Sequence, residues 1–334
     1  MTGRRAHTSA DKLTGVALLF LTLAGWSSSP LFLKYFVSSI DVWTSNGWRY
    51  AISALIWLPA VIVALRNRET PSALWRAALW PSVFNVAGQI CFAWVLYLNI
   101  DPGLMAFLLR LHIVFATTGA FLLFPDERRL MGEPAYWVGM LIVVAGVVGT
   151  IFLRHEPLGR AGEWGIAAGL VAGALFGCYA VAVRRCMSSF SSVTSFAVIS
   201  LYSAIGLLVP MLLLARGGGV EALRLLPFEM VMLFVSALAG IALGHVFYYA
   251  SMARLGVAVA SGVLLLQPFV TACASALIYG ERLTAAQWVS GAVSVLGAAL
   301  LLRIQAPRLS NRDPDALHCG RLAEPVRERH ADVR

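Results

Sequence analysis

The chain has 334 residues, of which 59% are hydrophobic and 13% are charged, whereas about 25% are charged in an ordinary soluble domain. A transmembrane helix needs about 20 apolar residues. The sequence supplies such runs repeatedly, without the alternating pattern of a membrane β-barrel. These features exclude a soluble globular enzyme, a disordered chain and a disulfide-linked secreted domain. The sequence therefore predicts an all-α polytopic membrane protein.

The net charge of +9 comes from 26 Lys and Arg residues against 17 Asp and Glu residues. Most basic residues lie between apolar runs and near the C-terminus, which is typical of topology signals and of contacts with anionic headgroups of the lipid bilayer. No basic stripe with interleaved aromatic residues is present, so we expect no nucleic-acid partner. Five scattered cysteines form no Cys-x-x-Cys pattern, so we expect no zinc site, no redox pair and no cofactor.

Ten apolar runs follow one another along the chain and are joined by short connections. They cover residues 13–36, 42–65, 79–98, 103–124, 135–153, 163–183, 193–215, 228–251, 256–279 and 285–303. We expect each run to form one transmembrane helix. Residues 1–12 form an N-terminal tail. Residues 304–334 carry many charges and three prolines, so we expect a disordered C-terminal tail.

The distribution of Lys and Arg over the connections predicts the orientation of these helices. One side collects eleven basic residues: Arg4, Arg5, Lys12, Arg66, Arg68, Arg76, Arg128, Arg129, Arg184, Arg185 and Arg254. The other side collects six: Lys34, Arg154, Arg160, Arg216, Arg224 and Arg282. Because the side richer in Lys and Arg usually faces the cytoplasm, we expect both termini to be cytoplasmic and the helices to lie in the cell membrane.

An internal repeat relates residues 13–153 to residues 163–303. Phe115, Thr117, Ala120, Leu123, Glu127 and Arg128 recur at one offset as Phe269, Thr271, Ala274, Leu277, Glu281 and Arg282. Gly15, Ala17, Ala24 and Lys34 recur as Gly165, Ala167, Ala174 and Arg184, Gly88-Gln89 as Gly244-His245, and Trp137-Val138 with Gly146 as Trp288-Val289 with Gly297. Since each half holds five helices, the second half enters the membrane from the opposite side. We expect two inverted five-helix repeats with a site between them near the bilayer midplane.

The sequence resembles the ten-helix EamA-type members of the drug/metabolite transporter superfamily over residues 13–303. The resemblance rests on the two five-helix halves and on a set of motifs: Gly280-Glu281-Arg282-Leu283, Asp126-Glu127-Arg128-Arg129-Leu130, Pro268, Arg49 and the Trp/Gly pattern of the fifth and tenth runs. It implies transport of a small metabolite, amino acid or drug through a central cavity lined by helices one, three, four, six, eight and nine. Val114 stands where the second half has Pro268, which argues against a symmetrical pair of helix kinks.

Polar groups at membrane depth are the first candidates for function, because a central charge costs about 2.5–3.5 kcal/mol on insertion scales. No Asp or Glu lies in the middle of a predicted span, so the usual carboxylate proton relay is absent. Arg110 in the fourth run could balance an anionic group of a substrate, or it could bond backbone carbonyls. His112 could couple protons. Being two residues apart, Arg110 and His112 are not expected to share a helix face.

Two further helices carry polar stripes. Asn85 and Gln89 are four residues apart in the third run and share a face, and Gln89 has His245 as its repeat mate. His245, Tyr248, Tyr249 and Met252 form one stripe of the eighth run. This stripe suits a ligand with apolar and hydrogen-bonding parts, and helix packing is the alternative interpretation. His245 is a second candidate for proton coupling.

The first and ninth runs each contain a proline within a polar stretch. Gln267, Thr271 and Ser275 step by four along the ninth run, and Pro268 frees a backbone carbonyl that could line a cavity. Trp26 begins the stretch Trp-Ser-Ser-Ser-Pro of the first run. Its indole could contact substrate, while the serines bond carbonyls released by the proline.

We therefore predict a substrate site formed by Trp26, Asn85, Gln89, Arg110, His112, His245, Tyr248 and Gln267. The expected function is secondary transport of a small solute by alternating access. Export is expected rather than uptake. A non-transporting scaffold or a channel is the alternative. An intramembrane enzyme is disfavoured, since the spans lack clustered aspartates, His-Glu-x-x-His and a Gly-x-Ser-Gly turn. The sequence names neither the solute nor the coupling ion, and it fits a monomer and a homodimer equally.

Overall fold

The computed structural model describes residues 9–66, 72–125, 128, 132–154, 159–255 and 257–310 of the chain. These residues are mostly helical and contain no strand. Residues 1–8 of the predicted N-terminal tail and residues 311–334 of the predicted C-terminal tail lie outside the described part. The last helix continues to Ser310, which is beyond its predicted end at residue 303.

The helices in chain order are α1 (Ser9–Phe36), α2 (Val42–Arg66), α3 (Ser72–Tyr97), α4 (Pro102–Leu108), η1 (Leu109–Leu111), α5 (His112–Leu123), α6 (Pro134–Phe152), α7 (Arg160–Met187), α8 (Ser192–Leu214), η3 (Arg216–Arg224), α9 (Pro227–Ala237), η4 (Leu238–Leu243), α10 (Gly244–Leu255), α11 (Val257–Leu264), α12 (Gln267–Tyr279) and α13 (Ala285–Ser310). The predicted fourth span is therefore α4–η1–α5, the eighth is α9–η4–α10, and the ninth is α11–α12.

The all-α polytopic membrane fold predicted from the sequence is confirmed. Nine helical segments of the described chain are long and apolar enough to cross a membrane. The predicted span 42–65 is α2, whose 25 residues extend over about 37 Å at 1.5 Å per residue. Its hydropathy is lower because its first half carries Thr44, Ser45, Asn46 and Arg49. All four are buried inside the protein rather than exposed to lipid.

The fourth span is interrupted even though it lacks a proline. Leu109–Leu111 form a single 3₁₀ turn, and the equivalent place in the ninth span is the break between α11 and α12, where Leu265 and Leu266 bond carbonyls three residues back. Pro268 explains the second break, because proline removes an intrahelical bond. In the first break, the carbonyl of Leu109 accepts a hydrogen bond from Nδ1 of His112 at 2.7 Å. The expectation that the two spans are not kinked symmetrically was thus wrong. The side chain of His112 stabilises the break in the fourth span, and Pro268 causes the equivalent break in the ninth.

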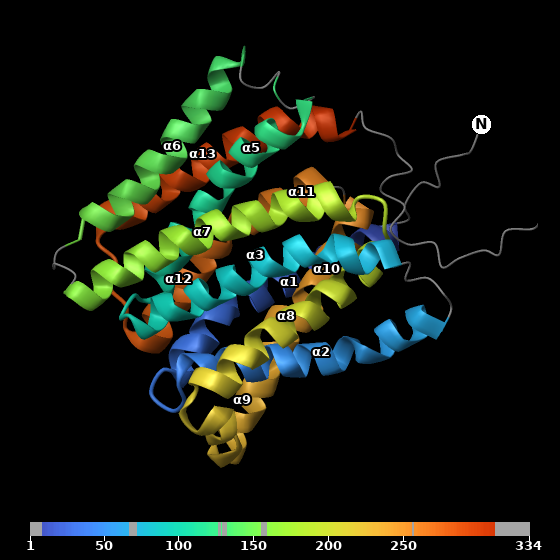
Figure 1. Ribbon diagram of the computed structural model, residues 1–334. Helices are drawn as coiled ribbons and strands as arrows, with labels where there is room; N and C mark the ends of the chain where they lie inside the picture. Colours follow the sequence, from blue (N-terminus) through green and yellow to red (C-terminus); the bar gives the residue numbers. More distant parts are fainter. Residues whose placement is uncertain are drawn as a thin grey trace, which may run out of the picture.

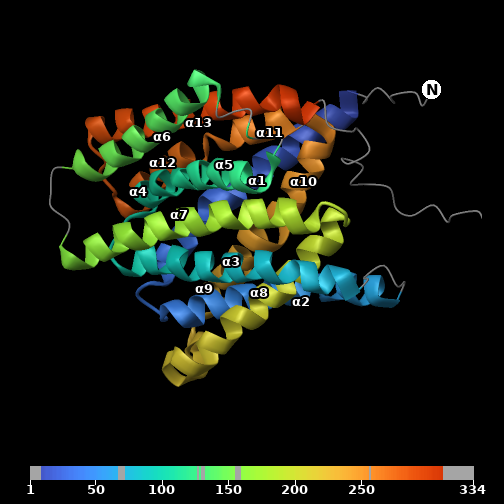
Figure 2. The same cartoon turned by 45° about the horizontal axis from the view of Figure 1, so that its top comes forward.

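The packing of the helices is symmetric under exchange of the two halves. α6 packs on α13 at one edge and α2 on α8 towards the other (Figure 1). Between these pairs, α3 packs on α7 as its mate α10 packs on α1, and α5 packs on α7 as its mate α12 packs on α1. Figure 2 shows the same order of helices from a second direction. This exchange of contacts is what a pair of five-helix repeats produces.

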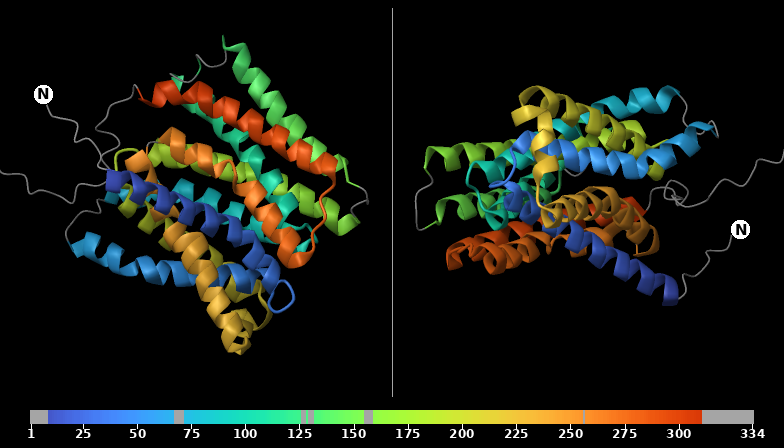
Figure 3. Two further views of the ribbon diagram at one scale, coloured as in Figure 1. Left: turned by 180° about the vertical axis from the view of Figure 1, so that it is seen from behind. Right: turned by 90° about the horizontal axis from the view of Figure 1, so that it is seen from below.

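The two ends of the described chain lie at the same end of the bundle. The first turn of α1 and the last turn of α13 lie at the same end in Figures 1 and 2, and the view from behind in Figure 3 agrees. A chain that crosses the membrane an even number of times has both of its ends on the same side. We refer below to this end as the terminal end and to the opposite end as the loop end.

Glycines allow α6 and α13 to approach closely. A Cβ atom on Gly146 would meet the carbonyl oxygen of Ser290 at 2.6 Å, and one on its repeat mate Gly297 would meet the backbone nitrogen of Val143 at 2.6 Å. Such backbone contact is typical of small residues at membrane helix crossings. The repeated glycine that the sequence comparison identified is therefore a packing residue.

Gly146→Ala is expected to destabilise the protein, because the added methyl overpacks a backbone contact and overpacking costs about 1–3 kcal/mol. Gly262→Ala is the matched control, since a Cβ at Gly262 in α11 meets nothing within 4 Å. Both substitutions gain similar helix propensity. The unfolding midpoint in detergent should fall for Gly146→Ala only. Equal midpoints for the two variants would contradict the close crossing.

Candidate functional site

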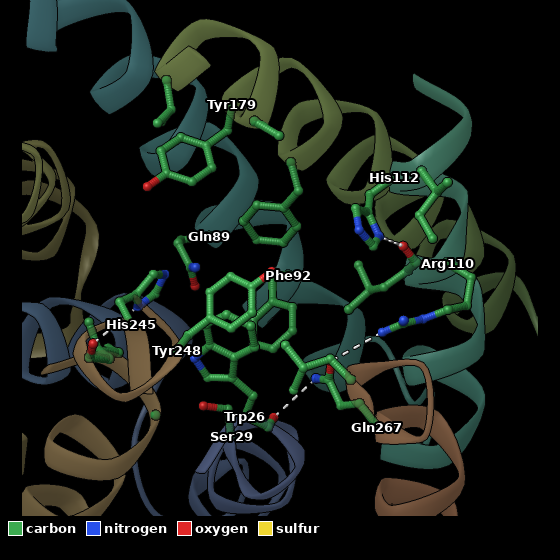
Figure 4. A pocket seen from close by; sticks show the side chains of 18 of the residues that line it. Trp26, Ser29, Gln89, Phe92, Arg110, His112, Tyr179, His245, Tyr248 and Gln267 are labelled. Carbon is green, nitrogen blue, oxygen red and sulfur yellow. Dashed lines mark hydrogen bonds between the residues drawn. The ribbon is translucent and has the colours of Figure 1, made fainter. Parts of the chain in front are cut away.

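A cavity of about 530 Å³ lies at mid-depth in the bundle, between the two halves. Its walls come from every span except those of α6 and α8: α1, α2, α3, the η1–α5 junction, α7, the η4–α10 junction, α11, α12 and α13. Figure 4 shows the labelled side chains pointing inward from these separate helices. Compared with the lining implied by the resemblance, α2 and α13 are additional.

Seven of the eight predicted site residues line this cavity. They are Trp26, Gln89, Arg110, His112, His245, Tyr248 and Gln267. Arg110 and His112 both reach it, although an α-helix would turn them to different faces, because the 3₁₀ turn changes the helical phase between them. Whether these residues contact a substrate stays a prediction.

Asn85 lies away from the cavity lining. Its amide donates a hydrogen bond to the hydroxyl of Ser203 in α8 at 2.8 Å. It shares a helix face with Gln89 as predicted, but it lies one turn earlier in α3, which also packs against α8. The geometry therefore gives Asn85 a role in joining α3 to α8.

The cavity is lined by pairs of repeat mates. The offsets that align the two halves pair Trp26 with Phe176, Ser29 with Tyr179, Gln89 with His245, Phe92 with Tyr248, Arg110 with Leu264 and Ile113 with Gln267, and all twelve line it. Sequence reasoning had missed Phe92, Phe176 and Tyr179, although their mates were either chosen or noted. The repeat itself was the signal that could have found them.

Arg110 is buried, with 6% of its side chain exposed. Its Nη2 donates to the amide oxygen of Gln267 at 3.1 Å, and the amide nitrogen of Gln267 donates to the carbonyl oxygen of Trp26 at 3.3 Å. This chain of bonds joins the fourth, ninth and first spans (Figure 4). Nε of Arg110 has no hydrogen-bond partner among the described residues.

Arg49 is a second buried arginine in the wall of the cavity, with 1% of its side chain exposed. Its Nε donates to the hydroxyl of Ser236 at 2.7 Å and its Nη2 to the hydroxyl of Ser29 at 3.4 Å. Nη1 has no hydrogen-bond partner within the described chain. The sequence signal was available, since Arg49 lies two turns inside α2, but it had been used only as a feature of the family resemblance.

The two cavity histidines are held by backbone carbonyls. Nδ1 of His112 bonds the carbonyl of Leu109, and Nδ1 of His245 bonds the carbonyl of Ile241 at 3.2 Å. Because a carbonyl only accepts, these contacts assign the proton to Nδ1 and make Nε2 the acceptor. His245 also stacks on Phe196, with ring centroids 4.6 Å apart. The π-helical turn η4 precedes His245, and such turns are frequent at functional sites.

Comparison with known families identifies the fold. The model of the EamA-like transporter family matches residues 13–153 and again residues 163–303. The chain belongs to the EamA-like transporter family. This confirms the resemblance inferred from the sequence, and it makes the chain a member of a family of membrane transporters.

Two further comparisons complete the description of this EamA-like transporter. A search of curated proteins finds no match. A crystal structure resembles the chain with a TM-score of 0.57 at 18% identity, covering 91% of this chain and 99% of that chain. At this identity the likeness shows the fold alone.

The loop end of the transporter is sealed by hydrogen bonds between the halves. The carboxylate of Glu281, just after α12, accepts the N–H groups of Gly103 and Leu104 at 2.8 and 2.9 Å. The hydroxyl of Tyr279 donates to the carbonyl of Leu31 at 2.6 Å. Glu281 thus caps the first turn of α4 in the other half. Its repeat mate Glu127 lies outside the described residues.

The wall of the cavity extends towards the terminal end. It includes Val183, four residues before the end of α7, and Leu302 in the last turns of α13. The cavity therefore extends from mid-depth towards the terminal end and stops short of the sealed loop end.

Glu281 is expected to make stability depend on pH. Burial raises the pKa of its carboxyl group, and Asp101, itself bridged to Lys34 at 3.2 Å, raises it further, while the N–H donors Gly103 and Leu104 lower it. The folded protein thus holds this proton more tightly than the unfolded chain. The resulting stabilisation is present below the ordinary carboxyl pKa of about 4.3 and is lost as pH rises through the raised pKa.

Glu281→Gln removes this dependence because glutamine carries no charge. The unfolding midpoint of Glu281→Gln minus that of the wild type should rise as the pH increases above about 4.3. Glu163→Gln, which removes an exposed carboxylate at the same end, is the reference for a general charge effect. A difference that stays flat or falls with pH would contradict the buried position of Glu281.

Proposed function

We propose that this EamA-like transporter is a secondary transporter that moves a small solute across the cell membrane by alternating access. The observation that carries the proposal is the cavity at mid-depth, lined by repeat mates from both halves. Secondary transporters with inverted repeats bind substrate at such a place, and the two halves then rock about it. The proposed substrate residues are Trp26, Gln89, Arg110, His112, His245, Tyr248 and Gln267.

The direction of opening follows from the charge distribution. With the side richer in Lys and Arg in the cytoplasm, both termini are cytoplasmic, and the loop end faces outward. The sealed loop end and the cavity extending towards the terminal end then correspond to an inward-facing state, in which an exporter loads solute from the cytoplasm and an importer releases it. Export is our proposal for the direction of transport.

The rival functions make different demands on the chain. A scaffold needs no polar cavity at membrane depth, where buried polar groups are costly. A channel needs a path open to both sides, whereas the bonds of Glu281 and Tyr279 close one end. These contacts favour a transporter, and the family assignment favours a non-enzymatic function.

Bridging the loop end should stop transport, because α4 and α12 must separate to open it. The variant Asp101→Cys/Glu281→Cys places two thiols across the seal, one at the N-cap of α4 and one just after α12, in a background where the native cysteines are replaced by alanine. A transported solute is first identified by comparing the metabolites of cells with and without the protein. Its flux is then measured in vesicles that contain the variant. A short cleavable bis-thiol reagent should abolish flux, and cleavage should restore it.

The matched control bridges a contact that the mechanism does not move. A Cβ on Gly139 in α6 would lie 2.9 Å from Leu301 in α13, so Gly139→Cys/Leu301→Cys should keep its flux when bridged. Undiminished flux through the bridged loop end would contradict alternating access. Absence of flux for every profiled solute would favour the scaffold.

Proton coupling is proposed through the acceptor nitrogens of His112 and His245. Their rings line the cavity from opposite halves (Figure 4), and a histidine ring can accept and release a proton. An imposed pH gradient should therefore increase flux in vesicles, and His112→Gln or His245→Gln should bring the ratio of flux with the gradient to flux at symmetrical pH close to one. A wild-type flux that is the same with and without the pH gradient would contradict proton coupling.

A further inference from the structure

Two buried arginines in one cavity have no acidic partner. Among the described residues that line the cavity there is no Asp or Glu, and the hydrogen-bond partners of Arg49 and Arg110 are neutral hydroxyl and amide groups. Each guanidinium keeps one nitrogen without a partner in the described chain, Nη1 of Arg49 and Nε of Arg110. A buried charge is costly unless it is paired. The cavity therefore carries an excess of positive charge that a bound anion would balance.

Both arginines are linked by hydrogen bonds to one turn of α1, Arg49 directly and Arg110 through Gln267. Arg49 donates to the hydroxyl of Ser29, while Gln267, which accepts from Arg110, donates to the carbonyl of Trp26. Trp26 and Ser29 are three residues apart, so both links end within one turn of α1, with about 4.5 Å of rise between the two residues. Gly240 makes this approach possible, because a Cβ there would collide with the Ser29 hydroxyl and come within 3.5 Å of Nη2 of Arg49.

The rest of the wall is largely aromatic. The rings of Trp26 and Tyr248 have centroids 5.2 Å apart, and those of Phe92 and Phe176 have centroids 6.1 Å apart. Tyr179 faces them from α7 (Figure 4). Such a wall suits an apolar or aromatic body, with the polar groups fixing its orientation. A cationic group would find no carboxylate in this wall.

We propose that the substrate is an organic anion, with a carboxylate or similar group held between Arg49 and Arg110 and an apolar or aromatic body against the rings. This inference rests on the proposed transport function and specifies its substrate class. It distinguishes a plain carboxylate from an amino acid with the same body, because the ammonium group of the amino acid has no anionic partner in the cavity.

The test compares four compounds that share one body. These are 3-phenylpropanoate, 3-phenylpropanamide, 3-phenylpropylamine and phenylalanine, with chloride and phosphate as inorganic anions. Binding is measured by titration on the purified protein and flux in vesicles. The expected order places 3-phenylpropanoate first, with roughly tenfold or more weaker binding for the amide, the amine and phenylalanine.

Substitutions assign the effect to the two arginines. Arg49→Gln and Arg110→Gln should each weaken binding of 3-phenylpropanoate roughly tenfold or more relative to binding of the amide. Arg49→Lys and Arg110→Lys keep the charge without the planar fork, so they should retain part of the affinity and report on folding of the site. Arg303→Gln, which removes an exposed charge in α13, is the matched control and should bind as the wild type does.

The outcomes separate this inference from the proposed function. If vesicles carry the amide, the amine or phenylalanine at least as well as 3-phenylpropanoate, the anion site is wrong and the transporter stands. Binding of chloride or phosphate without 3-phenylpropanoate would make the arginines an inorganic-anion site and overturn the inference. If no compound moves although 3-phenylpropanoate binds with the expected arginine dependence, the anion site stands and transport fails.

Discussion

The hydrocarbon of the membrane is the constraint on which this structure depends, because a backbone or side-chain polar group there must find a partner inside the protein. The fourth and ninth spans break at equivalent places, Leu109–Leu111 and Leu265–Leu266. A histidine ring stabilises the first break and a proline causes the second, and Leu109 and Leu265 of the two breaks both line the cavity. The cavity lies where these breaks meet, so the interruptions and the candidate site have one physical origin.

The two halves are similar in their helix arrangement but contribute different polar side chains to the cavity. Repeat mates line the cavity in pairs, yet Arg110 stands opposite Leu264, and Gln267 stands opposite Ile113. Arg110 and Gln267 then bond each other across the halves. The repeat provides two similar walls, whereas the two buried arginines of the cavity, Arg49 and Arg110, both come from the first half.

Much of this architecture could be predicted from the sequence, because apolar run length and the repeat are direct consequences of membrane thickness and helix geometry. Seven of eight site residues reach the cavity, since polar groups at membrane depth have few other places to lie. Arg49 was used only as a feature of the family resemblance, although its place two turns inside α2 already made it a candidate. The break at Leu109 could not be predicted, because it depends on a contact between a side chain and a carbonyl rather than on proline.

The central claim is that the two inverted halves open the cavity to one side as they close it to the other. Spin labels at Ser38 and Glu163 span the loop end, and the repeat mates Ser188 and Leu13 span the terminal end; all four positions are exposed. Distances within each pair, measured by electron–electron double resonance in lipid with and without solute, test the claim directly. Opposite changes at the two ends are predicted. Distances that stay fixed, or that change in the same sense at both ends, would contradict it.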